Sequence, residues 1–72
     1  MNTREIAAYL QEKHPEGQRV KLVRMNDKYA PAIGTLGTVS FVDSLGTVHV
    51  NWDNGSSLGV VYGEDVIKIV WT

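Results

Sequence analysis

The sequence predicts a mainly β protein in which five short strands follow a single N-terminal helix and pack as a small barrel or sandwich. Residues 47–52 alternate polar and apolar side chains without a break, as a strand with one buried face does. Turn-forming residues separate the apolar runs, and Asn54-Gly55 is among the strongest short hairpin signals. Apolar residues have helical spacing only near the N-terminus.

The composition of the chain restricts the classes of protein to consider. Its 72 residues suffice for one domain, and the absence of cysteine leaves no disulfide bond and no thiolate metal site. A net charge of −1 argues against a strongly nucleic-acid-binding domain. No apolar run is long enough to span a membrane and the N-terminus lacks a signal-peptide core, so we expect a soluble, cytoplasmic protein.

The expected helix begins after Asn2 and ends at His14. Asn2 can cap the helix, and Glu5 stands three residues later, where the acid of a capping box belongs. Pro15 disfavours helical geometry at the residue before it, which ends the helix.

One face of this helix carries side chains at i, i+3, i+4 and i+7 that form a narrow apolar stripe: Ile6, Tyr9, Leu10 and the stem of Lys13, with Ala7 beside them. A helix of about twelve residues is marginal in isolation, so the stripe must pack on something. We favour packing on the protein's own strands, with packing on a partner protein as the alternative.

The first strand covers residues 18–25. Its two faces carry different side chains, basic Arg19 and Lys21 on one and apolar Val20 and Leu22 on the other. The alternation slips at residues 23–24, which indicates a bulge or the end of the strand. Residues 26–33 then form a loop, in which Tyr29 either covers the end of the barrel or contacts a ligand.

The next two strands form a hairpin at the centre of the fold, with residues 38–42 and 47–52 joined by a glycine-containing turn. The side chains expected in the core from these strands are Val39, Phe41, Val48, Val50 and Trp52. Gly34, Gly37 and Gly46 are interpreted as corners or close backbone approaches, because a strand and not a helix follows them.

Two further strands complete the expected sheet, at residues 56–61 and 66–71, with a turn or a single 3₁₀ turn at residues 62–65. The inward side chains expected on these strands are Leu58, Val60, Ile67, Ile69 and Trp71. Lys68 points to the opposite face.

Several segments between residues 18 and 70 carry a family resemblance: Arg19-Val20, Leu22, Met25-Asn26-Asp27, Ala30-Pro31, Gly34-Thr35, Gly37-Thr38-Val39, Val42-Asp43, Val48-His49-Val50, Trp52-Asp53-Asn54-Gly55-Ser56-Ser57-Leu58 and Gly63-Glu64-Asp65. With these segments the chain resembles an uncharacterised family of short bacterial and phage proteins, the domain-of-unknown-function family 4314. Lys28 stands where the family often has a proline, which implies a less rigid loop. The N-terminal helix lies outside the matching part, and the family implies no activity.

More distantly, the Gly-Thr-Val strand and the Val-x-Trp-Asp-x-Gly hairpin are similar to SH3-like small barrels, including Mind-bomb-type and KOW-type domains. The former bind proteins and the latter bind RNA or proteins. This resemblance implies a five-stranded SH3-like barrel at residues 18–71. Together with a helix at residues 2–14, the barrel would make a single domain over residues 1–72.

The sequence contains no arrangement of residues that is typical of catalysis. His14 and His49 have no nucleophile or acid at a triad-like spacing, so both are interpreted as surface residues. Asp53-Asn54-Gly55 lacks the ligand pattern of a calcium loop and is interpreted as a turn. We therefore expect no enzymatic activity, no metal and no cofactor.

The leading functional hypothesis is a non-catalytic module that binds a protein or peptide. In an SH3-like barrel, the long loop after the first strand and the turn before the last lie beside one groove, and this analogy assigns to the groove Tyr29, Pro31, Tyr62, Asp27, Glu64 and Asp65. The alternative is nucleic-acid binding by the basic first strand and the loop after it, through Arg19, Lys21, Arg24 and Lys28. The identity of the partner and the oligomeric state stay open.

Overall fold

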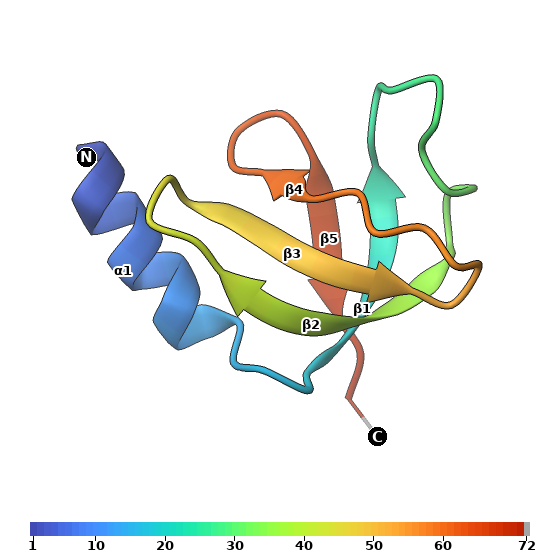
Figure 1. The fold of residues 1–72 in the computed structure, drawn as a ribbon, viewed down its shortest axis with the longest axis horizontal. Coiled ribbons are helices and arrows are strands. Elements are labelled where there is room, and N and C mark those ends of the chain that lie inside the picture. Colours follow the sequence, from blue (N-terminus) through green and yellow to red (C-terminus); the bar gives the residue numbers. More distant parts are fainter. Residues whose placement is uncertain (72) are drawn as a thin grey trace.

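A computed structural model of the chain describes residues 1–71 as one helix and five strands (Figure 1). The elements are α1 (Thr3–Lys13), β1 (Arg19–Arg24), β2 (Leu36–Val42), β3 (Thr47–Trp52), β4 (Val60–Val61) and β5 (Val66–Ile69). The strands form one antiparallel sheet in the order β4-β3-β2-β1-β5. Within residues 1–71 the sheet is open, because its edge strands β4 and β5 do not pair with each other. No helix in this part of the chain is long and apolar enough to cross a membrane.

The hydrophobic core lies on the inner face of the sheet. Its largest fully buried side chains are Leu22, Val20, Val39 and Val50. Trp52 is buried among them, and its indole Nε1–H donates a hydrogen bond of 2.9 Å to the Leu58 carbonyl. The predicted burial of Trp52 with Val48 and Val50 is confirmed, and Ile67 packs against the same cluster while partly exposed.

Gly37 in β2 lies where the tryptophan and a valine of β3 press against the backbone. A Cβ atom at this position would lie 2.5 Å from Val50 Cγ1 and 2.7 Å from Trp52 Cε3, well inside van der Waals contact. A residue without a side chain is therefore needed there, as the prediction of a close backbone approach requires.

The helix α1 packs on the chain's own sheet. Asn2 caps it, since Asn2 Oδ1 accepts a 2.9 Å hydrogen bond from the Glu5 N–H, as the sequence predicts. Leu10 belongs to the core cluster and Ile6 packs against it. Gln11 Nε2 also donates to the Val42 carbonyl at 3.3 Å, which ties α1 to the end of β2.

The buried face of α1 differs from the predicted stripe. Ala7, Leu10 and His14 are buried, whereas Tyr9 is 46% exposed and Lys13 is also exposed. Positions 7, 10 and 14 follow helical spacing as well, so the spacing alone does not choose between two neighbouring faces. The interpretation of His14 as a surface residue was wrong, because the residue is only 5% exposed. It forms the C-cap of the helix, and its backbone N–H donates to the Leu10 carbonyl at 2.8 Å.

The prediction that Phe41 lies in the core was also wrong. The register of β2 against β3 shifts between Val39 and Phe41, which leaves Ser40 as an extra residue in β2. This bulge turns Phe41 outward, where it is 53% exposed, and directs Val42 to the core in its place. Outside the core, Phe41 stacks on His49 with 4.3 Å between ring centroids and 10° between planes.

The two edge strands are shorter than predicted. Residues 56–59 are irregular, and β4 pairs with β3 through Val60 and Val61 alone. At the other edge, β5 ends at Ile69, which is only partly buried, and Trp71 is 85% exposed. Since β1 begins at Arg19, Trp71 has no strand left to pair with among the described residues.

Both hairpin turns have the same geometry. In each, a glycine N–H donates to the backbone carbonyl three residues earlier: Gly46 to the Asp43 carbonyl and Gly55 to the Trp52 carbonyl. Gly46 has φ 84° and Gly55 has φ 93°, and no other residue type has a positive φ within residues 1–71. The Asn54-Gly55 turn is therefore not a type I′ turn, which would require a positive φ at Asn54 as well. The geometry is that of a three-residue loop whose last position is a left-handed glycine.

Candidate functional site

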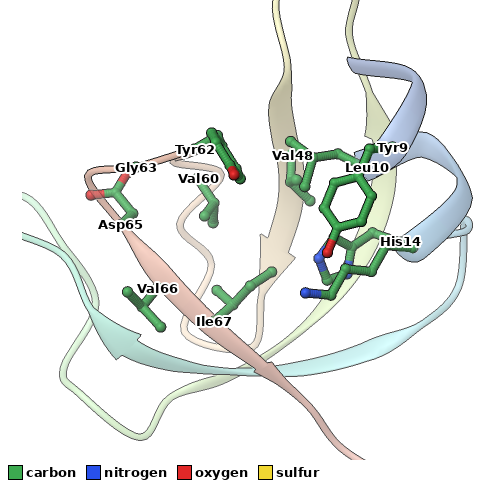
Figure 2. Close-up of a pocket in the computed structure, with 11 residues that line it drawn as sticks. Tyr9, Leu10, His14, Val48, Val60, Tyr62, Gly63, Asp65, Val66 and Ile67 are labelled. Carbon is green, nitrogen blue, oxygen red and sulfur yellow. The ribbon is translucent and has the colours of Figure 1, made fainter. Parts of the chain in front are cut away.

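A groove of about 470 Å³ lies between α1 and the segment that runs from β4 through the turn into β5 (Figure 2). We call it the α1–β5 groove. Its lining comes from five parts of the chain: Tyr9, Leu10, Lys13 and His14 of α1 and its C-cap, Val48 of β3, Val60 of β4, Tyr62, Gly63 and Asp65 of the turn, and Val66 and Ile67 of β5.

The floor of the groove is apolar because the sheet is open. β4 and β5 diverge from the turn at residues 62–65 without pairing, which leaves core side chains uncovered by backbone. Leu10 of α1 covers them from one side only. Leu10, Val48 and Val60 are themselves buried, so the groove is shallow at this point and its floor is continuous with the core.

Two exposed tyrosines stand at the rim. Figure 2 shows Tyr9 and Tyr62 on opposite sides of the floor, one projecting from α1 and the other from the turn. They are 46% and 51% exposed, and Val66 beside them is also exposed. Amphipathic rings around an apolar floor are typical of surfaces that bind other molecules.

The turn that carries Tyr62 is held by hydrogen bonds. The N–H groups of Glu64 and Asp65 both donate to the Val61 carbonyl, at 3.1 and 2.9 Å. In return the Val61 N–H donates to Asp65 Oδ2 at 2.9 Å. The Asp65 carboxylate therefore has a structural role in addition to its place in the groove lining.

His14 contributes the most buried polar group of the groove, with its residue 5% exposed. Its Nδ1 lies 2.6 Å from Gln18 Oε1, while Gln18 Nε2 donates to the Lys13 carbonyl at 3.1 Å. The amide oxygen of Gln18 can only accept, so Nδ1 carries the proton. In the neutral ring, Nε2 is then an acceptor to which no residue among 1–71 donates. This nitrogen is reached by solvent, because no buried side-chain nitrogen or oxygen among residues 1–71 lacks a hydrogen-bond partner.

The residues assigned to a peptide site from the sequence are only partly brought together. Tyr62 and Asp65 line the α1–β5 groove. The others do not line it: Asp27 and Tyr29 are exposed in the β1–β2 loop, and Pro31 of that loop is buried. Glu64 lies in the same turn as Tyr62 but is exposed outside the lining. In the β1–β2 loop the Tyr29 N–H donates to Asp27 Oδ1 at 2.8 Å, and Lys28 Nζ lies 5.0 Å from the centroid of the Tyr29 ring.

Sequence reasoning missed the part of the groove that α1 supplies. Tyr9 and Leu10 were recognised as members of an apolar stripe but not as part of a site, and His14 was assigned to the surface. The signal in the sequence was a helix with more apolar side chains than its buried face uses. That excess leaves Tyr9 on the groove side of α1.

A basic face lies on the outer side of β1 and β5. The predicted slip in β1 is confirmed as a register shift between Leu22 and Arg24, which leaves both Lys21 and Arg24 exposed. Met25 returns to the core after the shift. Lys68 of β5 is exposed and stands directly opposite Lys21 in the antiparallel register, so two like charges face each other across the strands.

Arg19, the first residue of this basic face, is engaged by an acid. Its guanidinium donates to both carboxylate oxygens of Asp53, at 2.9 and 2.7 Å, and to Thr38 Oγ1 at 2.9 Å. The hydrogen bonds from Arg19 hold the pKa of Asp53 below its usual range. This pair ties β1 to the turn after β3 and removes one of the four cations expected for nucleic-acid binding from the available charge.

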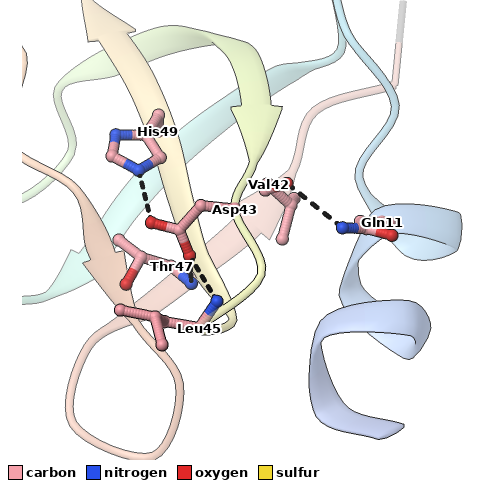
Figure 3. A network of polar contacts seen from close by, with 6 residues as sticks. All are labelled: Gln11, Val42, Asp43, Leu45, Thr47 and His49. Carbon is pink, nitrogen blue, oxygen red and sulfur yellow. Dashed lines mark hydrogen bonds and ion pairs between the residues drawn. The ribbon is translucent and has the colours of Figure 1, made fainter. Parts of the chain in front are cut away.

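A second polar cluster supports the β2–β3 turn (Figure 3). Asp43 Oδ1 accepts hydrogen bonds from the N–H groups of Leu45 and Thr47, at 2.9 and 3.0 Å, and Asp43 Oδ2 lies 2.8 Å from His49 Nε2. The bond from His49, and next the bond from Thr47, lowers the pKa of Asp43. Phe41 covers the imidazole from outside. Both oxygens of Asp43 and the His49 ring have hydrogen-bond partners within the hairpin, so the cluster stabilises the turn.

Fold and groove together define a class: a small, mainly β protein whose open antiparallel sheet packs on one helix, with an apolar groove along the opening. Residues 3–70 match the model of the family described as Domain of unknown function (DUF4314), and the chain therefore belongs to that family. The match includes α1, which the sequence resemblance had left outside. A search of curated proteins found no match to the chain.

Proposed function

We propose that the protein is a non-catalytic module, built as a small SH3-like barrel, that binds a protein or peptide in the α1–β5 groove. The observation that supports this most directly is the groove itself, with its buried apolar floor between two exposed tyrosines. A sheet whose two edge strands are joined by the short turn at residues 62–65 is consistent with a barrel left open at one seam.

The chemistry of the groove favours binding over catalysis. The Nδ1–H of His14 bonds to a neutral amide and not to a carboxylate, so the ring lacks the acidic partner that a catalytic triad has. The Asp65 carboxylate is occupied by the Val61 N–H. A volume of about 470 Å³ is enough for one or two side chains of a partner, and such anchors account for most of the affinity in peptide recognition.

Selection from a displayed library of random peptides of about eight residues, the length of a short strand, tests the proposal. We expect recovered peptides to shift the backbone NMR resonances of Tyr9, Tyr62 and Val66. Their affinity should fall about tenfold in Tyr62→Ser, because an aromatic anchor contact is lost. The matched control Leu45→Ser also removes an exposed apolar side chain, but outside the groove. Recovery of no peptide, or shifts that map elsewhere, would overturn the proposal.

A second candidate function is binding of nucleic acid by the basic face. The specific observation in its favour is that Lys21 of β1 lies directly opposite Lys68 of β5, with Arg24 at the end of β1. Among residues 1–71, no carboxylate lies within 4.0 Å of any of these three cations. Opposed cations cost stability unless a polyanion lies over them.

Titration with a fluorescent single-stranded oligothymidine of about twelve nucleotides tests this candidate. If it holds, affinity falls steeply as salt rises, and Lys21→Gln and Lys68→Gln each lower the slope of that dependence by about one. Arg4→Gln removes an exposed cation from α1 and serves as the charge-matched control. Equal effects of all three substitutions would indicate that net charge alone is responsible, and would exclude the basic face as a site.

A further inference from the structure

The outer edge of β5 has backbone groups without partners. β5 pairs only with β1, and the Val70 N–H donates to the Arg19 carbonyl at 2.9 Å. In an antiparallel pair, the N–H and C=O groups of alternate residues point to the same neighbour. Lys68 therefore also faces β1, and the N–H and C=O groups of Ile67 and Ile69 point to the free edge, where no residue among 1–71 pairs with them.

This free edge borders the α1–β5 groove. Val66 and Ile67 of β5 line the groove, and the Ile67 side chain packs on the same core cluster as the groove floor. An extended chain added along β5 would direct alternate side chains to the face that Ile67 occupies. Those side chains would meet the floor formed by Leu10, Val48 and Val60.

Two side chains of α1 define what such a chain must carry. His14 lines the groove, and its acceptor Nε2, which solvent reaches in the free protein, has no donor among residues 1–71. An apolar side chain with an N–H or O–H group can satisfy it, whereas a purely aliphatic one leaves it unpaired. Lys13 lines the same wall without an acidic partner within 4.0 Å, so it favours a carboxylate next to that anchor.

We propose that the α1–β5 groove takes an extended peptide as an additional strand on the free edge of β5. The peptide's anchor is a tryptophan or tyrosine whose N–H or O–H donates to His14 Nε2, with an acidic residue beside it near Lys13. This inference rests on the proposed peptide-binding function and deepens it, since it specifies the extended backbone conformation of the peptide and the class of its anchor.

Amide hydrogen exchange tests the added strand, with the tightest peptide from the library selection as the probe, synthesised with blocked ends. At saturation, the amides of Ile67 and Ile69 should exchange at least about tenfold more slowly, because they acquire partners. The amide of Val70 is the internal control, since it already donates to Arg19 in the free protein. Unchanged exchange at Ile67 and Ile69 overturns the added strand.

Backbone methylation of the same probe provides a second, independent measurement. In an added strand, alternate peptide N–H groups face β5 and the others face solvent. N-methylation of one alternating set should therefore abolish measurable binding, while methylation of the other set should change affinity by only a few-fold. Equal losses from both sets would contradict strand addition even if the peptide binds in the groove.

Paired substitutions at His14 test the anchor. The substitution His14→Asn keeps a donor near the position of Nδ1 and lacks any group at Nε2, whereas His14→Gln extends an amide toward that position. We expect affinity for the probe to fall about tenfold in His14→Asn and much less in His14→Gln. With the anchor ring replaced by naphthylalanine, which has no donor, the two variants should bind equally. If His14→Asn and His14→Gln bind the original probe equally well, the proposed contact between the anchor and His14 Nε2 is wrong.

The outcomes separate this inference from the proposal on which it rests. If no peptide is recovered, both fail. If peptides are recovered and map to Tyr9 and Tyr62 but leave Ile67 and Ile69 unprotected, the binding function stands and the strand addition fails. If either His14 variant does not fold, as judged by its NMR spectrum, the unsubstituted protein still tests the contact. It should bind the naphthylalanine probe about tenfold more weakly than the original probe, and equal affinity for the two probes would overturn the contact.

Discussion

Gly37 in β2 has no room for a side chain. Replacing it with alanine places a methyl group 2.5 Å from Val50 Cγ1 and 2.7 Å from Trp52 Cε3. We expect Gly37→Ala to lower the free energy of unfolding by about 1–3 kcal/mol or more, since an overpacked core must shift to accept the group. Urea denaturation measures this change.

Gly17→Ala is the control for that experiment. Gly17 has φ +87°, but a Cβ atom at this position would have nothing within 4 Å, so alanine meets backbone strain without a clash. The expected cost is about 1–2 kcal/mol. If Gly37→Ala is as stable as the original protein, the close packing of β2 on Trp52 is not a feature of the protein in solution.

Trp52 is expected to be the largest single contributor to the core. Trp52→Ala should cost about 3–5 kcal/mol, which is comparable to the whole stability of a domain of this size. Trp52→Phe keeps an aromatic ring but loses the bond from Nε1 to the Leu58 carbonyl, and should cost less. Thermal melting distinguishes the two, and an unchanged melting temperature in Trp52→Ala would contradict the burial.

The acid sensitivity of the fold should include a contribution from Asp43. The hydrogen bond from His49 and the backbone bond from Thr47 place its folded pKa below the unfolded one. This stabilisation is fully present above the unfolded pKa and is lost as pH falls through the folded pKa. Asp43→Asn should therefore be less stable at neutral pH and should lose less stability on acidification, as measured by the melting temperature at a series of pH values. Parallel curves for the two proteins would refute the linkage.

α1 provides a test of which helix face is buried. Leu10 belongs to the core, so Leu10→Ala should cost about 2–5 kcal/mol. Tyr9 is the next residue and half exposed, and Tyr9→Ala should change stability by no more than about 0.5 kcal/mol. Chemical denaturation of the two variants measures this difference. A larger cost at Tyr9 than at Leu10 would support the stripe predicted from spacing and contradict the structure.

The elements that local chemistry predicts well are those whose side chains alternate without interruption. Residues 47–52 form β3 with the predicted bounds, and the bulge of β1 falls where the alternation slips. The edge strands were predicted too long. Residues 56–59 do not form a regular ladder with β3, and the chain that follows β5 runs past the start of β1 after Val70, which still donates to the Arg19 carbonyl. A strand requires a partner in the sheet as well as suitable side chains.

The order of strands predicts how stability is distributed over the molecule. β2 has a strand on each side, β3 has the long β2 and the short β4, and β4 contributes only two residues. We expect amide exchange to be slowest for buried Val39, whose N–H donates to the Gln18 carbonyl at 2.9 Å, and faster for residues 56–59. Exchange measured residue by residue by NMR checks this. Slow exchange at residues 56–59 would indicate a longer β4 than the structure has.

The candidate site could be predicted only in part. Tyr62 and Asp65 were assigned to a binding surface because they lie in the turn before the last strand, which borders the groove of an SH3-like barrel, and they do line the α1–β5 groove. Tyr9 and His14, on the opposite wall, come from the other end of the chain. Their approach to the turn depends on where α1 docks, and no local pattern contains that information.

Local chemistry therefore determined the helix cap at Asn2, the central hairpin and the burial of Trp52, because each depends on neighbours in sequence or on strict alternation. The packed fold alone decided the outward turn of Phe41, the inward turn of His14 and the opening between β4 and β5. Each of these depends on register and on contacts between distant segments, where a shift of a single residue reverses the direction of every side chain that follows.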